Sequence, residues 1–194
     1  MCTPYRDGRL TLPDPAPEFP RTSLRSIAVT WNPDDPAGSA DEPVLFLDVD
    51  GVLNNLPHIW SIHAPCKPKW RELLPEKVLL LEEIVRRTGA AVVVSSSWGR
   101  RRGGLERVQD CLAHHGFTGA VVDTAPYSSL PGNHRADEVR AWREEVGHRG
   151  RFVVLDDEFP CGEPDLEPFV VRPDPMVGLL PEHMEEAVRI LGGA

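Results

Sequence analysis

Five short apolar runs follow one another from Val44 onward, and none of them alternates between apolar and polar residues. The runs are residues 44–47, 91–94, 120–122, 152–155 and 169–171. Uninterrupted apolar runs of this length are typical of parallel strands that are covered on both faces. Segments with helical patterning lie between or after the runs, at residues 75–88, 104–115, 133–146 and 181–191. Strands that alternate with helices predict an α/β fold, a doubly wound three-layer sandwich around a parallel central sheet.

Residues 1–43 have a different character. They contain eight of the chain's 20 prolines, and proline blocks helix and removes backbone donors. We therefore expect a proline-rich N-terminal arm over residues 1–43, with a possible edge strand at 26–31, followed by a single α/β domain over residues 44–194.

Charge and composition exclude several classes of protein. The chain has 30 acidic against 21 basic residues and a net charge of −9, which disfavours strong general binding to nucleic acid or to an anionic membrane. Residues 1–10 lack the apolar core of a signal peptide, and no run approaches the ~20 apolar residues of a membrane span. A cytoplasmic location is expected.

The four cysteines form no Cys-x-x-Cys pair, so neither a zinc site nor a disulfide framework is indicated. The oligomeric state stays open.

Polar clusters follow three of the five runs. They are residues 48–51, 95–97 and 156–157. Taken singly, each has an ordinary explanation as a turn or a helix cap. Their coincidence favours a site, because ligands bind at the carboxyl ends of the strands in open parallel sheets. Several carboxylates brought together repel one another unless a divalent cation neutralises them, and hard oxygen ligands select Mg²⁺. The predicted metal-site residues are Asp48, Asp50, Asp156 and Asp157.

These residues resemble a known family. The segment Val44–Asn54 (VLFLDVDGVLN), Ser95 and the Asp156-Asp157 pair are similar to motifs I, II and IV of the haloacid dehalogenase-like (HAD) phosphohydrolase superfamily. More narrowly, the stretches SSSW, VDTAP, LDDE and VRPDPMVGL, and the helical segment with Arg135, Glu138, Val139 and Trp142, resemble the HAD domain of Swiss Army Knife RNA repair proteins and its stand-alone bacterial relatives. The resemblance covers residues 44–192 and implies a HAD-like fold.

The resemblance also implies a reaction. It is phosphomonoester hydrolysis through an aspartyl-phosphate, with Asp48 as the nucleophile and Asp50 as the general acid and base. Ser95 would donate a hydrogen bond to the phosphoryl group. Mg²⁺ would be held by Asp48, by the backbone carbonyl of Asp50 and by the Asp156/Asp157 pair, and the choice of the direct ligand within that pair stays open.

The chain departs from the family pattern in its positive charge. HAD enzymes use a lysine that precedes the last motif, whereas the only lysines here are Lys67, Lys69 and Lys77, all of which precede motif II. Arg135 stands where the narrower group places an arginine. Its guanidinium is predicted to hold a phosphoryl oxygen and a carboxylate together, against the alternative of an exposed arginine at a helix start.

Three residues near motif II are predicted to bind substrate, namely Ser96, Trp98 and Arg100. The order Trp98-Gly99-Arg100 is a second departure, because the family pattern would place the arginine directly after the tryptophan.

Access to the site is expected to be open. No domain-sized insertion follows motif I or motif II, so no large cap is predicted, and residues 51–74 are interpreted as a rigid proline-rich loop at the entrance. Trp60, Trp70 or Trp98 could then stack on a terminal base. The expected substrate is a nucleic-acid end, a nucleotide or another phosphorylated small molecule. The alternatives are a small-metabolite phosphatase, a phosphotransferase and a non-catalytic HAD-like binding module.

Overall fold

The structure, a computed structural model, describes residues 40–62, 73–100, 102–128 and 134–193. The predicted arm, apart from its last four residues, lies outside this part of the chain, as does the expected edge strand over 26–31. Trp70 also lies outside it.

The central sheet has five parallel strands in the order β3-β2-β1-β4-β5. The strands are β1 (Val44–Leu47), β2 (Ala91–Val94), β3 (Val121–Thr124), β4 (Phe152–Leu155) and β5 (Val170–Val171). All five predicted strands are present, and three have the predicted bounds. The third begins one residue later than expected and continues through polar Asp123, whose carboxylate accepts a hydrogen bond from the buried Trp142 indole at 2.7 Å. The fifth is shorter, because Phe169 closes the 3₁₀ turn η3 (Glu167–Phe169).

Four helices match the predicted segments closely. They are α2 (Pro75–Thr88), α3 (Gly104–His114), α4 (Arg135–Glu145) and α5 (Pro181–Leu191). Proline occupies the first turn of α2 and of α5, where its missing amide costs no helical hydrogen bond. Each of these two helices ends at a glycine with a left-handed backbone, Gly89 at φ 70° and Gly192 at φ 72°.

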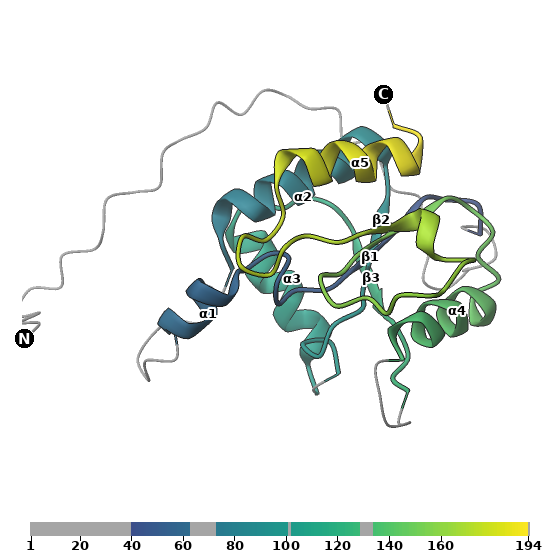
Figure 1. The fold of residues 1–194 in the computed structure, drawn as a ribbon, viewed down its shortest axis with the longest axis horizontal. Helices are drawn as coiled ribbons and strands as arrows, with labels where there is room; N and C mark the ends of the chain where they lie inside the picture. The colour runs from purple at the N-terminus through teal and green to yellow at the C-terminus, as the bar shows by residue number, and fades with distance from the viewer. Residues whose placement is uncertain (1–39, 63–72, 101, 129–133, 194) are drawn as a thin grey trace, which may run out of the picture.

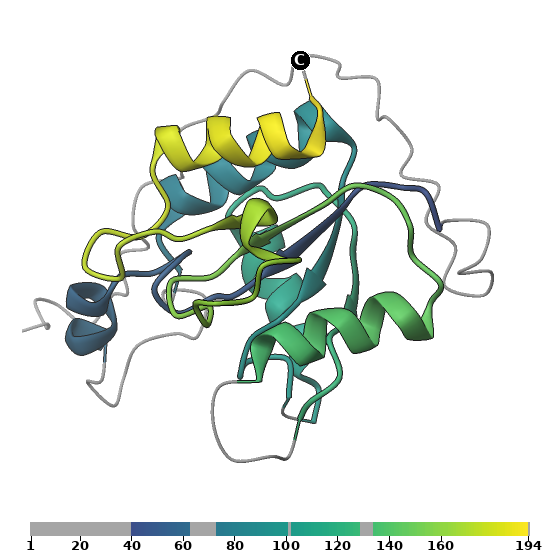
Figure 2. The same cartoon turned by 45° about the vertical axis from the view of Figure 1, so that its right-hand side comes forward.

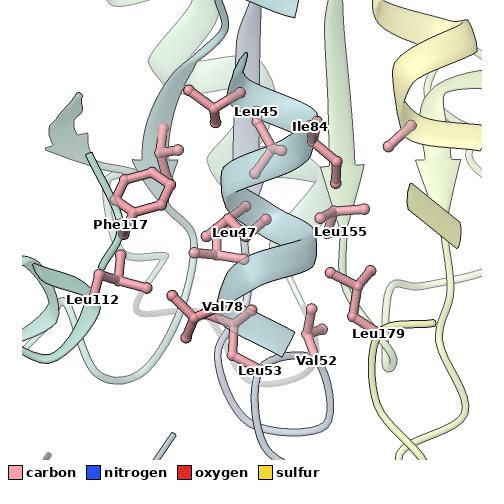
Figure 3. Packing of buried hydrophobic residues seen from close by; sticks show 14 of the residues in the cluster. Leu45, Leu47, Val52, Leu53, Val78, Ile84, Leu112, Phe117, Leu155 and Leu179 are labelled. Atoms are coloured by element: carbon pink, nitrogen blue, oxygen red, sulfur yellow. The ribbon is translucent and has the colours of Figure 1, made fainter. Parts of the chain in front are cut away.

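The helices cover both faces of the sheet, and α2 and α5 lie side by side on one of them (Figures 1 and 2). Helix α3 completes that layer, whereas α4 packs on the opposite face. Figure 3 shows the first core, in which Val78 and Ile84 of α2 lie over Leu45 and Leu47 of β1. The second core places Trp142 of α4 edge-on against Phe46 of β1, with ring centroids 5.4 Å apart. The predicted three-layer sandwich is confirmed.

Helix α1 (Leu56–Ile62) corrects part of the expectation of a rigid proline-rich loop over residues 51–74, of which residues 63–72 lie outside the described part of the chain. The Asn55 side chain accepts a hydrogen bond from the backbone amide of His58 at 2.8 Å, which is the geometry of a helix N-cap. Pro57 lies in the first turn, where proline is tolerated. Part of the proline-rich segment interpreted as a loop is therefore helical.

The described residues contain no large cap domain, since only the short helix α1 lies between β1 and α2 there, and only α3 lies between β2 and β3. No helix in the described residues is long and apolar enough to cross a membrane.

Candidate active site

The three predicted polar clusters meet at one edge of the sheet. From β1 the chain continues to β2 and β3 on one side of the sheet, and from β4 it continues to β5 on the other side. Ligands bind at such a switch in strand order, here between β1 and β4. Asp48 directly follows β1 and donates its amide to the Leu155 carbonyl at the end of β4, at 2.9 Å. Ser95 follows β2 and donates its amide to the Leu47 carbonyl at 2.8 Å. Backbone hydrogen bonds between strand ends thus fix the clusters next to one another.

Three carboxylates form the centre of the site. Asp48, Asp156 and Asp157 each offer an oxygen, and these oxygens lie within 4.8 Å of one another. Asp48 is only 8% exposed and Asp156 only 1%. Gly51 packs directly against the Asp157 carboxylate, and a side chain at position 51 would collide with it. The φ of Gly51 is 81°, which other residues rarely adopt. The turn after β1 therefore requires glycine so that Asp157 can approach.

The electrostatics of this cluster are those of excess negative charge. Burial raises the pKa of Asp48, although the Arg135 charge and a hydrogen bond from the Ser96 hydroxyl oppose the rise. Burial, and then the charge of Asp48, raise the pKa of Asp156 to about 7 and that of Asp157 to about 6. The raised pKa values show that these buried carboxylates repel one another when they are ionised. A divalent cation bound between them would relieve this repulsion.

Arg135 reaches this cluster from the first turn of α4. Its Nε lies 2.8 Å from Asp156 Oδ2, and its Nη2 lies 3.4 Å from Asp48 Oδ2. The side chain is 13% exposed, so the alternative of an exposed helix-start arginine does not hold. The guanidinium spans the ends of the two central strands, as the sequence predicted for a group that holds a carboxylate.

Asp50 is held apart from the three-carboxylate cluster. Its Oδ2 accepts a hydrogen bond from the Trp98 indole at 3.0 Å, and its Oδ1 accepts one from the Asn54 amide at 2.9 Å. Asn54 is in turn fixed by the Gly51 backbone amide, which donates to its Oδ1 at 3.1 Å. Asp48 and Asp50 are two residues apart in the sequence, yet they have different surroundings and can do different chemistry.

The two serines after β2 are both buried but differ in their partners. Ser96 hydrogen-bonds to the Asp48 carboxylate. The Ser95 hydroxyl is buried and has no hydrogen-bond partner among the described residues. A buried hydroxyl without a partner is costly unless a ligand completes it, so Ser95 marks where a polar ligand would lie.

Trp98 and Arg100, both predicted to bind substrate, have partners within the protein. Trp98 donates to Asp50, and the Arg107 guanidinium lies 4.5 Å from the centre of its ring. Arg107 thus covers one face on which a base could stack. Arg100 pairs with Glu138 and lies 4.4 Å from the ring centre of the exposed Tyr127. Whether either side chain contacts substrate stays a prediction.

Two residues of the site had no assigned role at the level of sequence. Asn54 was only the last residue of the segment that resembles motif I. Glu138 was only one residue of a helical segment that resembles the family. The burial of their polar side chains, at 1% and 4% exposure, is the signal that identifies them.

The Trp98 hydrogen bond gives a first prediction. If the site carries out the phosphomonoester hydrolysis that the family resemblance implies, Trp98→Phe should lower kcat about ten-fold, because a hydrogen bond to a charged group contributes about 1.5–3 kcal/mol and here orients the carboxylate of Asp50, the expected general acid. An alkyl alcohol needs a proton on departure and p-nitrophenol does not, so the loss should be larger with an alkyl phosphate than with p-nitrophenyl phosphate.

Thr118→Val is the control, since it removes another side-chain donor to a carboxylate, that of Glu82, at an exposed place outside the site. An equal loss on both esters, or the same loss in the control, would mean that Trp98 does not act through Asp50.

Comparison with known proteins agrees with this geometry. The family described as "HAD domain in Swiss Army Knife RNA repair proteins" matches residues 44–184. No curated protein and no solved structure matches the chain significantly.

Proposed function

Because the chain belongs to the family of HAD domains found in Swiss Army Knife RNA repair proteins, we propose that it is a Mg²⁺-dependent phosphohydrolase acting on phosphate monoesters. One observation carries the proposal. Asp48 lies at the end of the central strand β1, with the Asp156 and Asp157 carboxylates and the Arg135 guanidinium converging on it.

In the first step a carboxylate oxygen of Asp48 attacks phosphorus, and the bond between phosphorus and the leaving oxygen breaks. Asp50 gives a proton to that oxygen, and the alcohol leaves. The burial of Ser95 and its unpaired hydroxyl support a hydrogen bond to a phosphoryl oxygen. The position of Arg135, between Asp48 and Asp156, supports a second contact to the phosphoryl charge.

In the second step Asp50 takes a proton from water, whose oxygen attacks phosphorus and breaks its bond to Asp48. Inorganic phosphate leaves and the Asp48 carboxylate is restored. Asp50 is suited to both steps because Trp98 and Asn54 hold its carboxylate outside the three-carboxylate cluster.

The residues fit a hard divalent cation, as the crowded and buried carboxylates require a positive partner. Asp48, Asp156 and Asp157 would hold it, together with the Asp50 carbonyl. When bound, Mg²⁺ supplies charge that neutralises the phosphoryl oxygens. This leaves Arg135 to orient the phosphoryl group and Asp50 to move the proton.

Arg135 gives the second prediction. We expect Arg135→Ala to lower kcat/KM by about 10²-fold, the scale of losing one preorganised donor to transition-state charge. Arg135→Lys should recover part of the loss, since lysine restores the positive charge but not the two-pronged hydrogen-bonding geometry of the guanidinium. Steady-state kinetics on any accepted ester measures both. Kinetics of Arg135→Ala close to those of the wild-type protein would remove the residue from the site.

For the substrate we propose a phosphate at the end of a nucleic acid or nucleotide. The lack of a large cap in the described residues, and the exposed Trp60 on α1, support a site open to large molecules. The net charge of −9 argues against a long nucleic-acid track, so contact is expected at the end alone.

The test compares kcat/KM for a 3′-phosphorylated oligonucleotide, a 5′-phosphorylated oligonucleotide, a mononucleotide and a sugar phosphate, each with Mg²⁺. Preference for an oligonucleotide end supports the proposal. Preference for the sugar phosphate would indicate a small-metabolite phosphatase, and transfer of phosphate to an added alcohol in place of water would indicate a phosphotransferase. Activity on none of them would favour the non-catalytic binding module.

A further inference from the structure

Glu138 is a buried carboxylate shared by two arginines. It lies in α4, three residues after Arg135, and is 4% exposed. Both of its oxygens accept from Arg100 Nη2, at 2.9 and 3.0 Å, and Oε2 lies 3.5 Å from Arg135 Nη1. The Ser128 amide donates to Oε1 at 3.2 Å. One side chain thus joins the segment after β2, the segment after β3 and the start of α4.

The two arginines differ in their surroundings. Arg135 contacts Asp48 and Asp156 through its other nitrogens and is 13% exposed. Arg100 is 32% exposed and rests on the Tyr127 ring, which is itself exposed. Glu138 therefore links the guanidinium that contacts Asp48 and Asp156 to a more exposed guanidinium, that of Arg100, which the sequence predicts to bind substrate at the rim of the site.

Burying a carboxylate is expensive, and replacing an ion pair by apolar side chains is often neutral or stabilising. Stability alone therefore explains this arrangement poorly. Another pair shows the contrast. On the same helix Arg140 meets Asp165 at 2.6 Å on the exterior, where neither partner is buried and no contact leads to the site.

We propose that Glu138 is a positioning residue that fixes the orientation of Arg135 against the nucleophile and of Arg100 at the rim, so that one carboxylate couples phosphoryl binding to contact with the rest of the substrate. The contact to Nη1 limits rotation of the Arg135 fork, whose other nitrogens point to Asp48 and Asp156. The inference rests on the proposed phosphohydrolase function for its kinetic consequences, but not for its consequence for phosphate binding.

The kinetic experiment uses Glu138→Gln, which keeps the size of the side chain and removes the charge that holds both arginines. We expect kcat to fall and KM to rise, each about ten-fold, the scale of coupling between directly contacting residues. In an Arg100→Met background the same substitution should still lower kcat, through Arg135, but should raise KM by a smaller factor than it does with Arg100 in place. A residue that merely stabilises the fold would not separate the two constants in this way.

Asp165→Asn is the control, because it removes one of the three acidic partners of Arg140, an arginine on the same helix, at a place with no contact to the site. Its kinetics should equal those of the wild-type protein. If Glu138→Gln does not fold, Glu138→Asp replaces it; aspartate keeps the charge but is one methylene too short to serve both arginines, so the same split is expected.

Binding of inorganic phosphate, measured by calorimetry with Mg²⁺ present, gives a readout that needs no turnover. Glu138→Gln should bind phosphate about three-fold more weakly than the wild-type protein, less than the rise in KM, because inorganic phosphate has no further part for Arg100 to contact. Asp165→Asn should bind it as well as the wild-type protein does. If no ester is hydrolysed but this difference appears, the proposed function is wrong and the role of Glu138 stands. If Glu138→Gln binds phosphate and turns over like the wild-type protein while Asp48→Asn is inactive, the role of Glu138 is wrong. If the wild-type protein neither binds phosphate nor hydrolyses any ester, both are overturned.

Discussion

The Asp48→Asn variant is expected to lose phosphohydrolase activity by at least about 10³-fold, since removing a catalytic nucleophile leaves only the contribution of binding and of the remaining donors. An amide has nearly the volume of a carboxylate but cannot form the aspartyl-phosphate. The measurement is turnover on the best ester of the substrate panel. Retention of more than a few per cent of wild-type turnover would contradict the covalent mechanism.

The fold of this variant should survive, and the electrostatics give the reason. Burial raises the pKa of Asp48, so its charge is held in the fold at a cost, and this charge also raises the pKa of Asp156 and Asp157. Removing it relieves repulsion, while Arg135 keeps its contact with Asp156 at 2.8 Å. Without metal, the melting temperature should therefore be no lower than that of the wild-type protein. Asp48→Ala serves as a control, because slow deamidation of asparagine would restore aspartate and mimic residual activity.

Much of the fold could be predicted from the sequence because its signals are local. The unalternating apolar runs gave β1, β2 and β4 with correct bounds, since a strand covered on both faces needs apolar residues at every position. Prolines and glycines marked the ends of α2 and α5. The prediction was wrong at α1, where Asn55 caps a helix whose proline suggested a loop. Cap and turn use the same residue types, and only the backbone path separates them.

The candidate site could be predicted only in part. That the clusters would meet followed from topology, because the carboxyl ends of parallel strands share one edge. The separate roles of the site residues could not be predicted, since they depend on contacts between residues far apart in the sequence. Trp98 and Asp50 are 48 positions apart, and Arg100 and Glu138 are 38 apart. No local pattern shows that the Trp98 indole donates to Asp50, or that Glu138 is buried between two arginines.

Mg²⁺ is expected to control both activity and stability. Chelation with EDTA should abolish turnover, and restoring Mg²⁺ should recover it, because the buried carboxylates of Asp48, Asp156 and Asp157 need a positive partner before an anionic substrate can approach. A ligand that binds only the folded state stabilises it, by about 2.7 kcal/mol at a concentration 100 times its Kd. The melting temperature should therefore rise with Mg²⁺. Full activity in EDTA, with metal absent by elemental analysis, would contradict the metal assignment.

The effect of Mg²⁺ should also depend on pH in a defined direction. The pKa of Asp156 is raised to about 7 and that of Asp157 to about 6, from an ordinary value of 3.8. The metal-free fold therefore binds more protons than the unfolded chain between about pH 4 and 7, so these groups make it less stable as the pH rises through that window. Mg²⁺ requires the deprotonated carboxylates, so the rise in melting temperature that it causes should be small at pH 5.5 and large at pH 8.

NaCl at matched ionic strength controls for screening. Asp157→Asn should reduce the Mg²⁺ effect at pH 8, whereas Asp165→Asn, an acidic residue far from the cluster, should leave it unchanged. An equal Mg²⁺ effect at both pH values would show that the ion binds elsewhere than at these carboxylates.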